Sequence, residues 1–272
     1  MSTSPEPARP RRRPLATTVR RAEWLSPTFV RIVLGGGDLD RFAGAPFADA
    51  YVKVMFLHPD GDYARPVDPE VIRATMPREY WPRLRTYTVR AWDPAQRELT
   101  LDFVVHGDEG LAGPWARDAR PGDEVLFMGP GGAYSPDPAA GWHLLVGDES
   151  ALPAIAAAAE RVPDSATARL FIEVAGPDDE LPLKRPAGAQ LTWLHRGPEP
   201  VGARLVEAVT GFEFPAGDVH AFVHGEAGFV KVLRRWLLDE KAVPRERLSI
   251  SGYWRVGVDD ENWRAIKADF DR

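Results

Sequence analysis

The stretch Arg85-Thr86-Tyr87-Thr88-Val89-Arg90 is the one around which the rest of the chain is interpreted. Its alternation is typical of a β-strand, with Arg85 and Tyr87 on one face and Thr86, Thr88 and Arg90 on the other. Arginine offers a rigid fork of donors to phosphate oxygens, tyrosine a flat aromatic face, and threonine a hydroxyl for a ring heteroatom. The stretch therefore suits a flat ring that carries a pyrophosphate tail. A surface strand with solvated arginines explains the same residues equally well, so the decision lies downstream.

Composition excludes several classes of function. The chain has 272 residues, 44% hydrophobic and 27% charged, which is long enough for two domains of ordinary globular character. Its net charge of −6 argues against a nucleic-acid partner. Cysteine is absent, which excludes disulfides, iron–sulfur clusters, thiolate zinc sites and cysteine nucleophiles. Any redox chemistry must therefore use a bound organic cofactor.

The first residues differ from the rest of the chain. Residues 1–14 are rich in proline and arginine and predict a disordered tail. No apolar segment follows them, and no stretch approaches transmembrane length. We expect a cytoplasmic protein without membrane insertion.

Short strands separated by proline and glycine turns occupy residues 15–132 and predict a small antiparallel barrel. The expected strands are Leu15–Glu23, Thr28–Leu34, Tyr51–Leu57, Arg83–Trp92, Glu98–His106 and Glu124–Met128. Between His58 and Pro82 lies a proline-rich excursion with a helical piece near Glu70–Met76. Long excursions of this kind are where lids tend to lie.

From Trp142 onward, short apolar runs alternate with helical segments, which predicts a parallel sheet covered by helices on both faces. The expected strands are Leu144–Val146, Arg169–Val174, Gln190–Leu194, Val219–Val223 and Leu248–Ser251. The expected helices are Ala151–Val162, Gly202–Val209, Gly228–Glu240 and Asp260–Phe270. We therefore expect one domain at 15–132, a linker at 133–141 and a second domain at 142–272.

Two turns are candidate phosphate sites. Gly110-Leu111-Ala112-Gly113 precedes a short helix over Gly113–Ala119, and small residues there let backbone N–H groups approach a pyrophosphate. A capped surface helix is the simpler explanation of that turn taken alone. Gly147-Asp148-Glu149-Ser150 forms the first strand-to-helix turn of the second domain, where parallel sheets bind ligands. This turn lacks the G-x-G-x-x-G pattern, and its two acidic side chains would repel a phosphate. We therefore expect a nucleotide to bind here only loosely. The same acids also suit a simple helix-capping role.

Metal-dependent and hydrolytic chemistry have little support. His220 and His224 are four residues apart on an expected strand, without a third ligand nearby, so no metal site is expected. No serine stands in a nucleophile elbow.

The order of these motifs resembles that of the siderophore-interacting proteins, which are flavin-dependent ferric-siderophore reductases of the ferredoxin-reductase-like superfamily. The resemblance runs from about Leu15 to the end of the chain. The matching blocks are Arg85-x-Tyr87-Thr88-x-Arg90, Asp102-Phe103-Val104-x-His106, Pro121-Gly122-Asp123, Gly129-Pro130-x-Gly132, Gly147 to Ile155, Gly225-Glu226 and Gly252-Tyr253-Trp254-Arg255.

The resemblance implies a flavin-binding barrel, a pyridine-nucleotide domain and bound FAD. In such proteins the tyrosine of the first motif lies against the isoalloxazine and its arginines hold the pyrophosphate. By the same matching, Val104 and His106 would line the flavin and Trp254 would lie near the ring. The cofactor-binding residues that we expect are Arg85, Tyr87, Thr88, Arg90, Asp102, Val104, His106, Ala112, Gly113, Trp115, Asp148, Glu149, Ser150 and Trp254.

Three positions depart from the family pattern. Gly113 stands where a serine or threonine usually caps the short helix and touches phosphate, which puts FAD affinity in question. Ser150 replaces a usual threonine. Gly131 follows the Gly129-Pro130 turn, where a basic residue is frequent, so one positive charge near the substrate is missing.

Three functions remain open at this point. The first is an NAD(P)H-dependent, FAD-containing reductase of ferric siderophores; the second is a flavin reductase with another acceptor, such as a quinone, free flavin or electron-transfer protein. The third is a siderophore- or flavin-binding module without turnover. We expect a monomer, and the sequence does not identify the siderophore.

Two finer expectations concern the substrates. Glu173 and the run Asp178-Asp179-Glu180 follow the second strand of the sheet, which favours NADH because an acid there suits a ribose hydroxyl and repels a 2′-phosphate. A solvated acidic loop explains the run equally well. Lys53 and Arg255 are candidates to steer an anionic ferric siderophore. In the alternative interpretation, Lys53 extends along the barrel edge and Arg255 pairs with Asp259 or Glu261.

Overall fold

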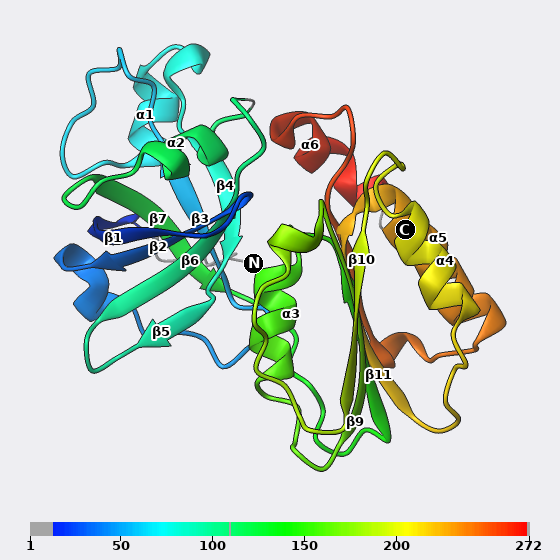
Figure 1. The fold of residues 1–272 in the computed structure, drawn as a ribbon. Helices are drawn as coiled ribbons and strands as arrows, with labels where there is room; N and C mark the ends of the chain where they lie inside the picture. Colours follow the sequence, from blue (N-terminus) through cyan, green and yellow to red (C-terminus); the bar gives the residue numbers. More distant parts are fainter. Residues whose placement is uncertain (1–12, 109, 271–272) are drawn as a thin grey trace, which may run out of the picture.

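A computed structural model describes residues 13–108 and 110–270, so residues 1–12 of the predicted tail lie outside the described part. It contains a curled antiparallel sheet and an open parallel sheet, which lie side by side with helix α3 between them (Figure 1). The predicted fold class, a β-barrel followed by an α/β parallel sheet, is thereby confirmed. Within the described residues, no helix combines the length and apolarity that a membrane crossing requires.

The barrel has seven strands in the order β4-β3-β7-β1-β2-β6-β5, and every neighbouring pair is antiparallel. Its strands are β1 (Leu15–Ser26), β2 (Phe29–Gly35), β3 (Tyr51–Phe56), β4 (Arg83–Thr88), β5 (Ala91–Asp93), β6 (Glu98–Val104) and β7 (Glu124–Gly131). The segment predicted as one strand over Arg83–Trp92 is split into β4 and β5. It splits because the N–H of Val89 donates to Ala50 while that of Arg90 donates to Thr100 on β6 at 2.9 Å, which curls the sheet toward closure.

The helices of this half are short. They are the 3₁₀ helix η1 (Gly37–Arg41), α1 (Pro69–Thr75), the 3₁₀ helix η2 (Arg78–Tyr80) and α2 (Ala112–Asp118). Asp68 caps α1 by accepting from the backbone of Glu70 and Val71, with Pro69 at the first position. The excursion between His58 and Pro82 packs through Val67 and Ile72 against apolar side chains of β3 and β7, in a cluster separate from the main barrel core.

The second sheet is parallel, in the order β10-β9-β8-β11-β12. Its strands are β8 (Trp142–Gly147), β9 (Thr167–Val174), β10 (Ala189–His195), β11 (Val219–Glu226) and β12 (Leu248–Trp254). Its helices are α3 (Leu152–Ala159), η3 (Pro177–Asp179), α4 (Ala203–Gly211), α5 (Ala227–Arg235), the π-helical turn η4 (Trp236–Glu240), η5 (Arg245–Arg247) and α6 (Asp260–Phe270). α3 packs on the face toward the barrel, whereas α4 and α5 cover the opposite face (Figure 1).

The two sheets share part of their core. Phe29 of β2 and Tyr134 pack in the same buried cluster as α3 and β9. Asp179 on η3 accepts hydrogen bonds from the Ser26 hydroxyl, the Thr28 hydroxyl and the Thr28 backbone, and it is 4% exposed. These contacts fix the barrel against the sheet, and the space left between them is the candidate site.

Candidate functional site

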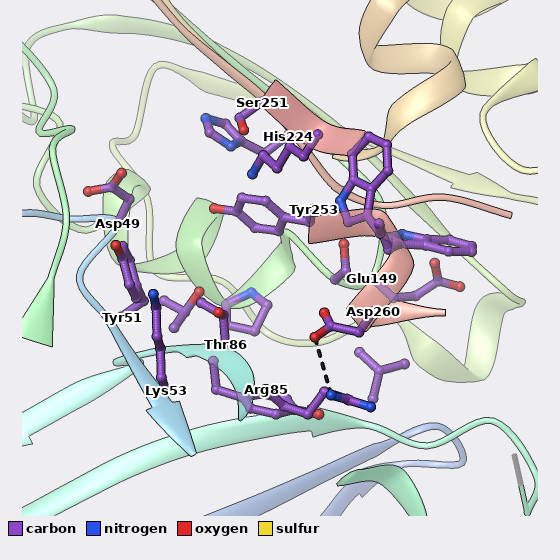
Figure 2. Close-up of a pocket in the computed structure, with 18 of the residues that line it drawn as sticks. Asp49, Tyr51, Lys53, Arg85, Thr86, Glu149, His224, Ser251, Tyr253 and Asp260 are labelled. Atoms are coloured by element: carbon purple, nitrogen blue, oxygen red, sulfur yellow. Dashed lines mark hydrogen bonds and ion pairs between the residues drawn. The ribbon is translucent and has the colours of Figure 1, made fainter. Parts of the chain in front are cut away.

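A cleft of about 690 Å³ opens between the barrel and the parallel sheet (Figure 2). Its walls come from β3, β4 and β6 on the barrel side and from the ends of β8, β11 and β12 on the other, with α6 at one side. It is lined by Asp49, Tyr51, Lys53, Arg85, Thr86, Tyr87, Thr88, Asp102, Val104, His106, Ala133, Glu149, Ser150, Pro153, His224, Ser249, Ile250, Ser251, Tyr253, Trp254, Asp260, Trp263, Arg264 and Lys267. A volume of this size is typical of a site for a small organic ligand.

The aromatic wall of the cleft is built on the barrel. The ring of Tyr87 lies 4.0 Å from that of Phe103, and Trp115 of α2 packs behind Phe103 with ring centroids 5.4 Å apart. Burial raises the pKa of the Tyr87 phenol above its ordinary value, so the phenol stays neutral. A neutral tyrosine held from behind by the barrel core offers a fixed flat surface to a planar ligand.

Asp102 of β6 lines the barrel wall of the cleft. Its carboxylate is 3% exposed and accepts two hydrogen bonds from Arg31, at 2.7 and 2.8 Å. This bidentate pairing balances one buried negative charge with one positive charge. Asp102 therefore shapes the cleft, while its carboxylate is already fully engaged.

The two arginines of the first motif join the two halves of the molecule. Arg85 donates to Asp260 at 3.2 Å (Figure 2). It also donates to Glu261, on α6 like Asp260, at 2.6 and 3.1 Å. Arg90 donates to Glu160, which follows α3, at 2.6 Å. The guanidinium of Arg85 thus makes the paired contacts that it could also make to a phosphate, although its partners here are carboxylate oxygens.

Asp148 is the central acceptor of the sheet wall. It is fully buried and accepts from the Ser150 backbone at 2.9 Å, the Glu226 backbone at 2.7 Å and the Trp254 indole at 2.8 Å. Burial raises the pKa of Asp148, although these hydrogen bonds oppose the shift. A side chain at Gly225 would approach the same carboxylate to 2.7 Å, so the close packing here requires glycine. Asp148 therefore fixes Trp254 at the cleft.

Glu149 belongs to a buried group of three charges at the same edge. Arg196 lies between two carboxylates, donating to Glu149 at 2.5 Å and to Glu173 at 2.9 Å. Glu149 is 2% exposed, and burial raises its pKa to about 7, with the neighbouring Asp148 adding to the shift. Glu149 is the member of this group that lines the cleft.

Two histidines face the cleft from opposite walls. Burial lowers the pKa of His106, and the positive charge of Arg196 lowers it further. His224 stacks on Phe222 at 3.9 Å, its Nε2 lies 3.0 Å from the Ser249 hydroxyl, and burial lowers its pKa to about 3. His220, the other half of the spaced pair, accepts instead from the backbone of Asp137. Among residues 13–108 and 110–270, no group of three or more candidate ligands could hold a metal ion.

The cleft brings together ten of the sixteen predicted site residues. They are Lys53, Arg85, Tyr87, Thr88, Asp102, Val104, His106, Glu149, Ser150 and Trp254. The other six are not part of its lining: Arg90, Ala112, Gly113, Trp115, Asp148 and Arg255. Arg90 faces Glu160, Trp115 supports the wall from the barrel core, and Asp148 is buried behind Trp254.

The predicted residues that do not line the cleft, and the positions that depart from the family pattern, also have physical explanations. Ala112 and Gly113 form the first turn of α2, which lies so close to β6 that a side chain at Gly113 would meet the Val104 carbonyl at 3.3 Å. Glycine rather than serine thus allows this packing. Arg255 follows β12 and forms a backbone bridge with Val258, which turns the chain into α6. At Gly131, an added side chain would collide with the Tyr51 ring at 2.4 Å, so Tyr51 occupies the space where the family often has a basic residue.

The acids taken as a ribose-binding patch are mostly engaged within the protein. Glu173 is fully buried against Arg196 and the Gly202 backbone, Asp179 holds the barrel, and Glu180 pairs with His195 at 2.8 Å. Glu173 and Asp179 are therefore buried by tertiary partners far along the chain.

Several cleft residues escaped the sequence analysis. Ser249, Ser251 and Tyr253 lie on one face of β12, and this period of two was visible in the sequence but carried no chemical signal by itself. Asp260, Trp263, Arg264 and Lys267 recur at helical spacing and form the face of α6 that lines the cleft.

Comparisons with known proteins agree with this geometry. Residues 18–134 match the domain family described as "Siderophore-interacting FAD-binding domain", and residues 140–257 match "Siderophore-interacting protein". The chain belongs to the siderophore-interacting protein family. An uncharacterised protein of Mycobacterium tuberculosis is 47% identical over 89% of this chain and 90% of its own length. Ferric vibriobactin reductase ViuB of Vibrio cholerae is 33% identical over 89% of each chain.

A further relative, an NADPH-dependent ferric-chelate reductase of Escherichia coli, is 32% identical over 88% of this chain and 92% of that protein. Among solved structures, the siderophore-interacting protein SipS from Aeromonas hydrophila superposes with a TM-score of 0.80 at 33% identity, covering 96% of this chain and 98% of that one. Ferredoxin–NADP⁺ reductase from Plasmodium falciparum superposes with a TM-score of 0.62 at 12% identity over 88% and 96% of the two chains, which establishes the shared fold alone. The fold is therefore ferredoxin-reductase-like.

The cleft residues fit the flavin that the family implies. Tyr87 gives a flat neutral surface, and the neighbouring hydroxyls of Thr86 and Thr88 can hydrogen-bond polar atoms of a ring edge. Arg85, 16% exposed and already bound to carboxylates, has the charge and fork that a pyrophosphate requires. An aromatic wall, adjacent hydroxyls and an arginine at one rim correspond to the ring, its polar edge and its charged tail.

Proposed function

We propose that this protein is an FAD-dependent reductase of ferric siderophores that takes its electrons from a nicotinamide nucleotide. The observation that carries the proposal is the cleft itself, which joins the FAD-binding barrel to a parallel sheet and is lined by Tyr87, Arg85 and Lys53. Ferric reductases among the named relatives support the same class of acceptor. A cytoplasmic location and a monomeric state remain predictions.

The barrel supplies the binding surface. Tyr87 would contact one face of the ring system, Thr86 and Thr88 could hydrogen-bond its edge, and Arg85, which donates to Asp260 and Glu261 in this structure, would hold the pyrophosphate. When bound, FAD accepts a hydride from a two-electron donor and passes single electrons to a one-electron acceptor. The protein's own task is to hold the donor and the acceptor against the same ring and to exclude competing reactions.

The ferric substrate arrives with its iron already saturated by the oxygen ligands of the siderophore. The protein therefore has no need to supply iron ligands, and steering by charge is sufficient. Lys53 is exposed and lines the cleft from β3. We assign the steering of an anionic siderophore to Lys53 rather than to Arg255, whose side chain is not among those lining the cleft. Once reduced, iron is held far less tightly by hard oxygen ligands, and release follows.

The donor is proposed only as a nicotinamide nucleotide. The expected preference for NADH rested on the acids after β9, and Glu173 and Asp179 are not available to a ribose. The E. coli relative is described as NADPH-dependent. Comparing rates of flavin reduction by NADH and by NADPH under anaerobic conditions decides the preference.

A stopped-flow experiment in two steps tests the proposal. The FAD-loaded protein is reduced anaerobically by the nucleotide and then mixed with an anionic ferric siderophore, with ferrous iron trapped by a colorimetric chelator. We expect Lys53→Gln to keep its flavin and its reduction by nucleotide, and to raise the apparent KM for the siderophore about 3- to 10-fold, an effect that added salt abolishes. Lys184→Gln, at an exposed lysine outside the cleft lining, is the matched control.

Two results would contradict the proposal. Reduced protein that transfers electrons to a quinone or to free flavin but not to the ferric siderophore would identify another acceptor. A protein whose flavin is not bleached by either nucleotide would be a binding module without turnover.

A further inference from the structure

The carboxyl edge of the parallel sheet holds an uneven number of buried charges. Glu149 and Glu173 share one guanidinium, that of Arg196, and the side chains of the three are 3%, 0% and 17% exposed. Two buried carboxylates against one cation leave an excess negative charge. Such an excess is costly in a site away from water, and binding a proton removes it.

The two carboxylates of this triad differ in how well they are satisfied. Glu173 accepts from Arg196 at 2.9 Å and from the Gly202 backbone with both oxygens, at 2.9 and 3.1 Å. Glu149 accepts from Arg196 with Oε2, whereas its Oε1 is buried and has no hydrogen-bond partner among the described residues. The proton therefore belongs on Glu149, whose pKa burial raises to about 7.

The charged groups around Glu149 also favour a proton on this side chain. Asp148, its neighbour in the chain, adds a second negative charge and raises the pKa of Glu149, while Arg196 opposes the shift. Across the cleft, His106 is near enough to Arg196 and Asp148 for both to influence its pKa, and burial together with Arg196 keeps its imidazole neutral. Glu149 is thus the acid of this group that can gain and lose a proton near neutral pH.

Glu149 also lines the cleft in which the proposed reaction releases a proton. Figure 2 shows it among the residues that line the cleft between the barrel and the sheet. The lining also includes Ser150 and His106. The proposed reaction, on which this inference rests, converts one NAD(P)H and two ferric ions into NAD(P)⁺, two ferrous ions and one proton. We propose that Glu149 is the proton carrier of the cleft, whose carboxylate takes up the proton released in each turnover and returns it to solvent.

The first test uses the cofactor-free protein and needs no catalysis. Infrared difference spectra between wild type and Glu149→Gln, recorded from pH 5 to pH 9, isolate the carbonyl stretch of a protonated Glu149. We expect a protonated-acid band in the wild type that disappears with a midpoint near pH 7. Glu98→Gln, at a glutamate that is paired with Arg21 and lies outside the cleft lining, is the matched control and should leave that band unchanged. Absence of the band at pH 6 would overturn the proposal.

The second test measures the transfer itself with an artificial one-electron acceptor. FAD-loaded protein is photoreduced and mixed with ferricyanide, so the result does not depend on the natural substrate. We expect the wild-type oxidation rate to rise with pH through about 7, and Glu149→Gln to be about 10²-fold slower and without this ionisation. Equal rates and equal pH profiles in the two proteins would overturn the proposal, even with the infrared band present. Failure to reduce a ferric siderophore, with both ferricyanide results as expected, would instead contradict the proposed function.

Discussion

Two buried ion groups stand on opposite walls of the cleft, and they are built from the same side-chain chemistry with different counts. On the barrel wall, Asp102 and Arg31 form a one-to-one bidentate pair. On the sheet wall, Arg196 serves Glu149 and Glu173 together. A balanced pair stabilises its charges through mutual attraction, whereas the second group has one negative charge more than its cation can compensate. At Glu149 burial is the main cause of the raised pKa, and an excess of negative charge, here from the neighbouring Asp148, adds to the shift.

The largest effect is expected from removing the shared cation. Arg196→Met leaves two carboxylates facing each other away from water, which should lower the free energy of unfolding by about 3–5 kcal/mol. The loss should grow as pH rises, because each carboxylate is then tolerated only in its protonated form. Urea unfolding at pH 6 and pH 8 measures both features. In the control Arg21→Met, whose side chain is 56% exposed, we expect less than about 1 kcal/mol.

Removing the excess negative charge should raise the free energy of unfolding. The pKa of Glu149 is raised in the folded protein, from an ordinary value of 4.5 to about 7, so folding is penalised progressively as pH rises between these values and fully above them. Glu149→Gln should therefore stabilise the protein by about 2–3 kcal/mol at pH 8 and by much less at pH 5. A variant less stable than wild type at pH 8 would contradict the unequal charge count.

The matching substitution on the balanced pair should destabilise. Asp102→Asn removes a fully engaged carboxylate and leaves Arg31 without its bidentate partner, at a cost of about 2 kcal/mol at pH 7. The cost is smaller than for Arg196→Met because the Arg31 side chain is 30% exposed and can be solvated. Thermal unfolding of Asp102→Asn and Glu149→Gln, side by side at pH 8, gives opposite shifts in Tm if the comparison holds.

The smallest effect on stability is expected from a buried side chain that stays neutral in the folded protein. His143 is fully buried, and burial, with the nearby His220, lowers its pKa to about 4. Since the unfolded chain binds this proton near pH 6.5, stability should fall as pH drops from about 6.5 toward 4, by about 1–2 kcal/mol at pH 5. His143→Leu should flatten this part of the profile. An unchanged slope between pH 5 and pH 7 would show that His143 is not its source.

Much of the site could be predicted because residues that are close together on one strand remain close together in the folded protein. Tyr87 and Thr88 are neighbours on β4, and Asp102 and Val104 are both on β6, and the family resemblance was enough to assign all four to the flavin site. The position of the excursion after β3 could not be predicted, because it depends on the packing of Val67 and Ile72 against the barrel. Arg85 and Arg90 were predicted to bind an anionic group through their guanidinium groups. In the fold, their partners are carboxylates of α6 and of the residue after α3.

The sequence by itself determined the order of a barrel and a parallel sheet, the absence of thiol chemistry, and the family, because these follow from local periodicity, composition and short motifs. It did not determine which charges would be buried together. Glu149, Glu173 and Arg196 lie on three different segments, and only the parallel pairing of β8, β9 and β10 brings their ends to one edge. The same holds for Asp179, which became a partner of Thr28 across 151 residues. Side-chain ionisation depends on desolvation and on charges within a few ångströms, and those distances exist only in the folded molecule.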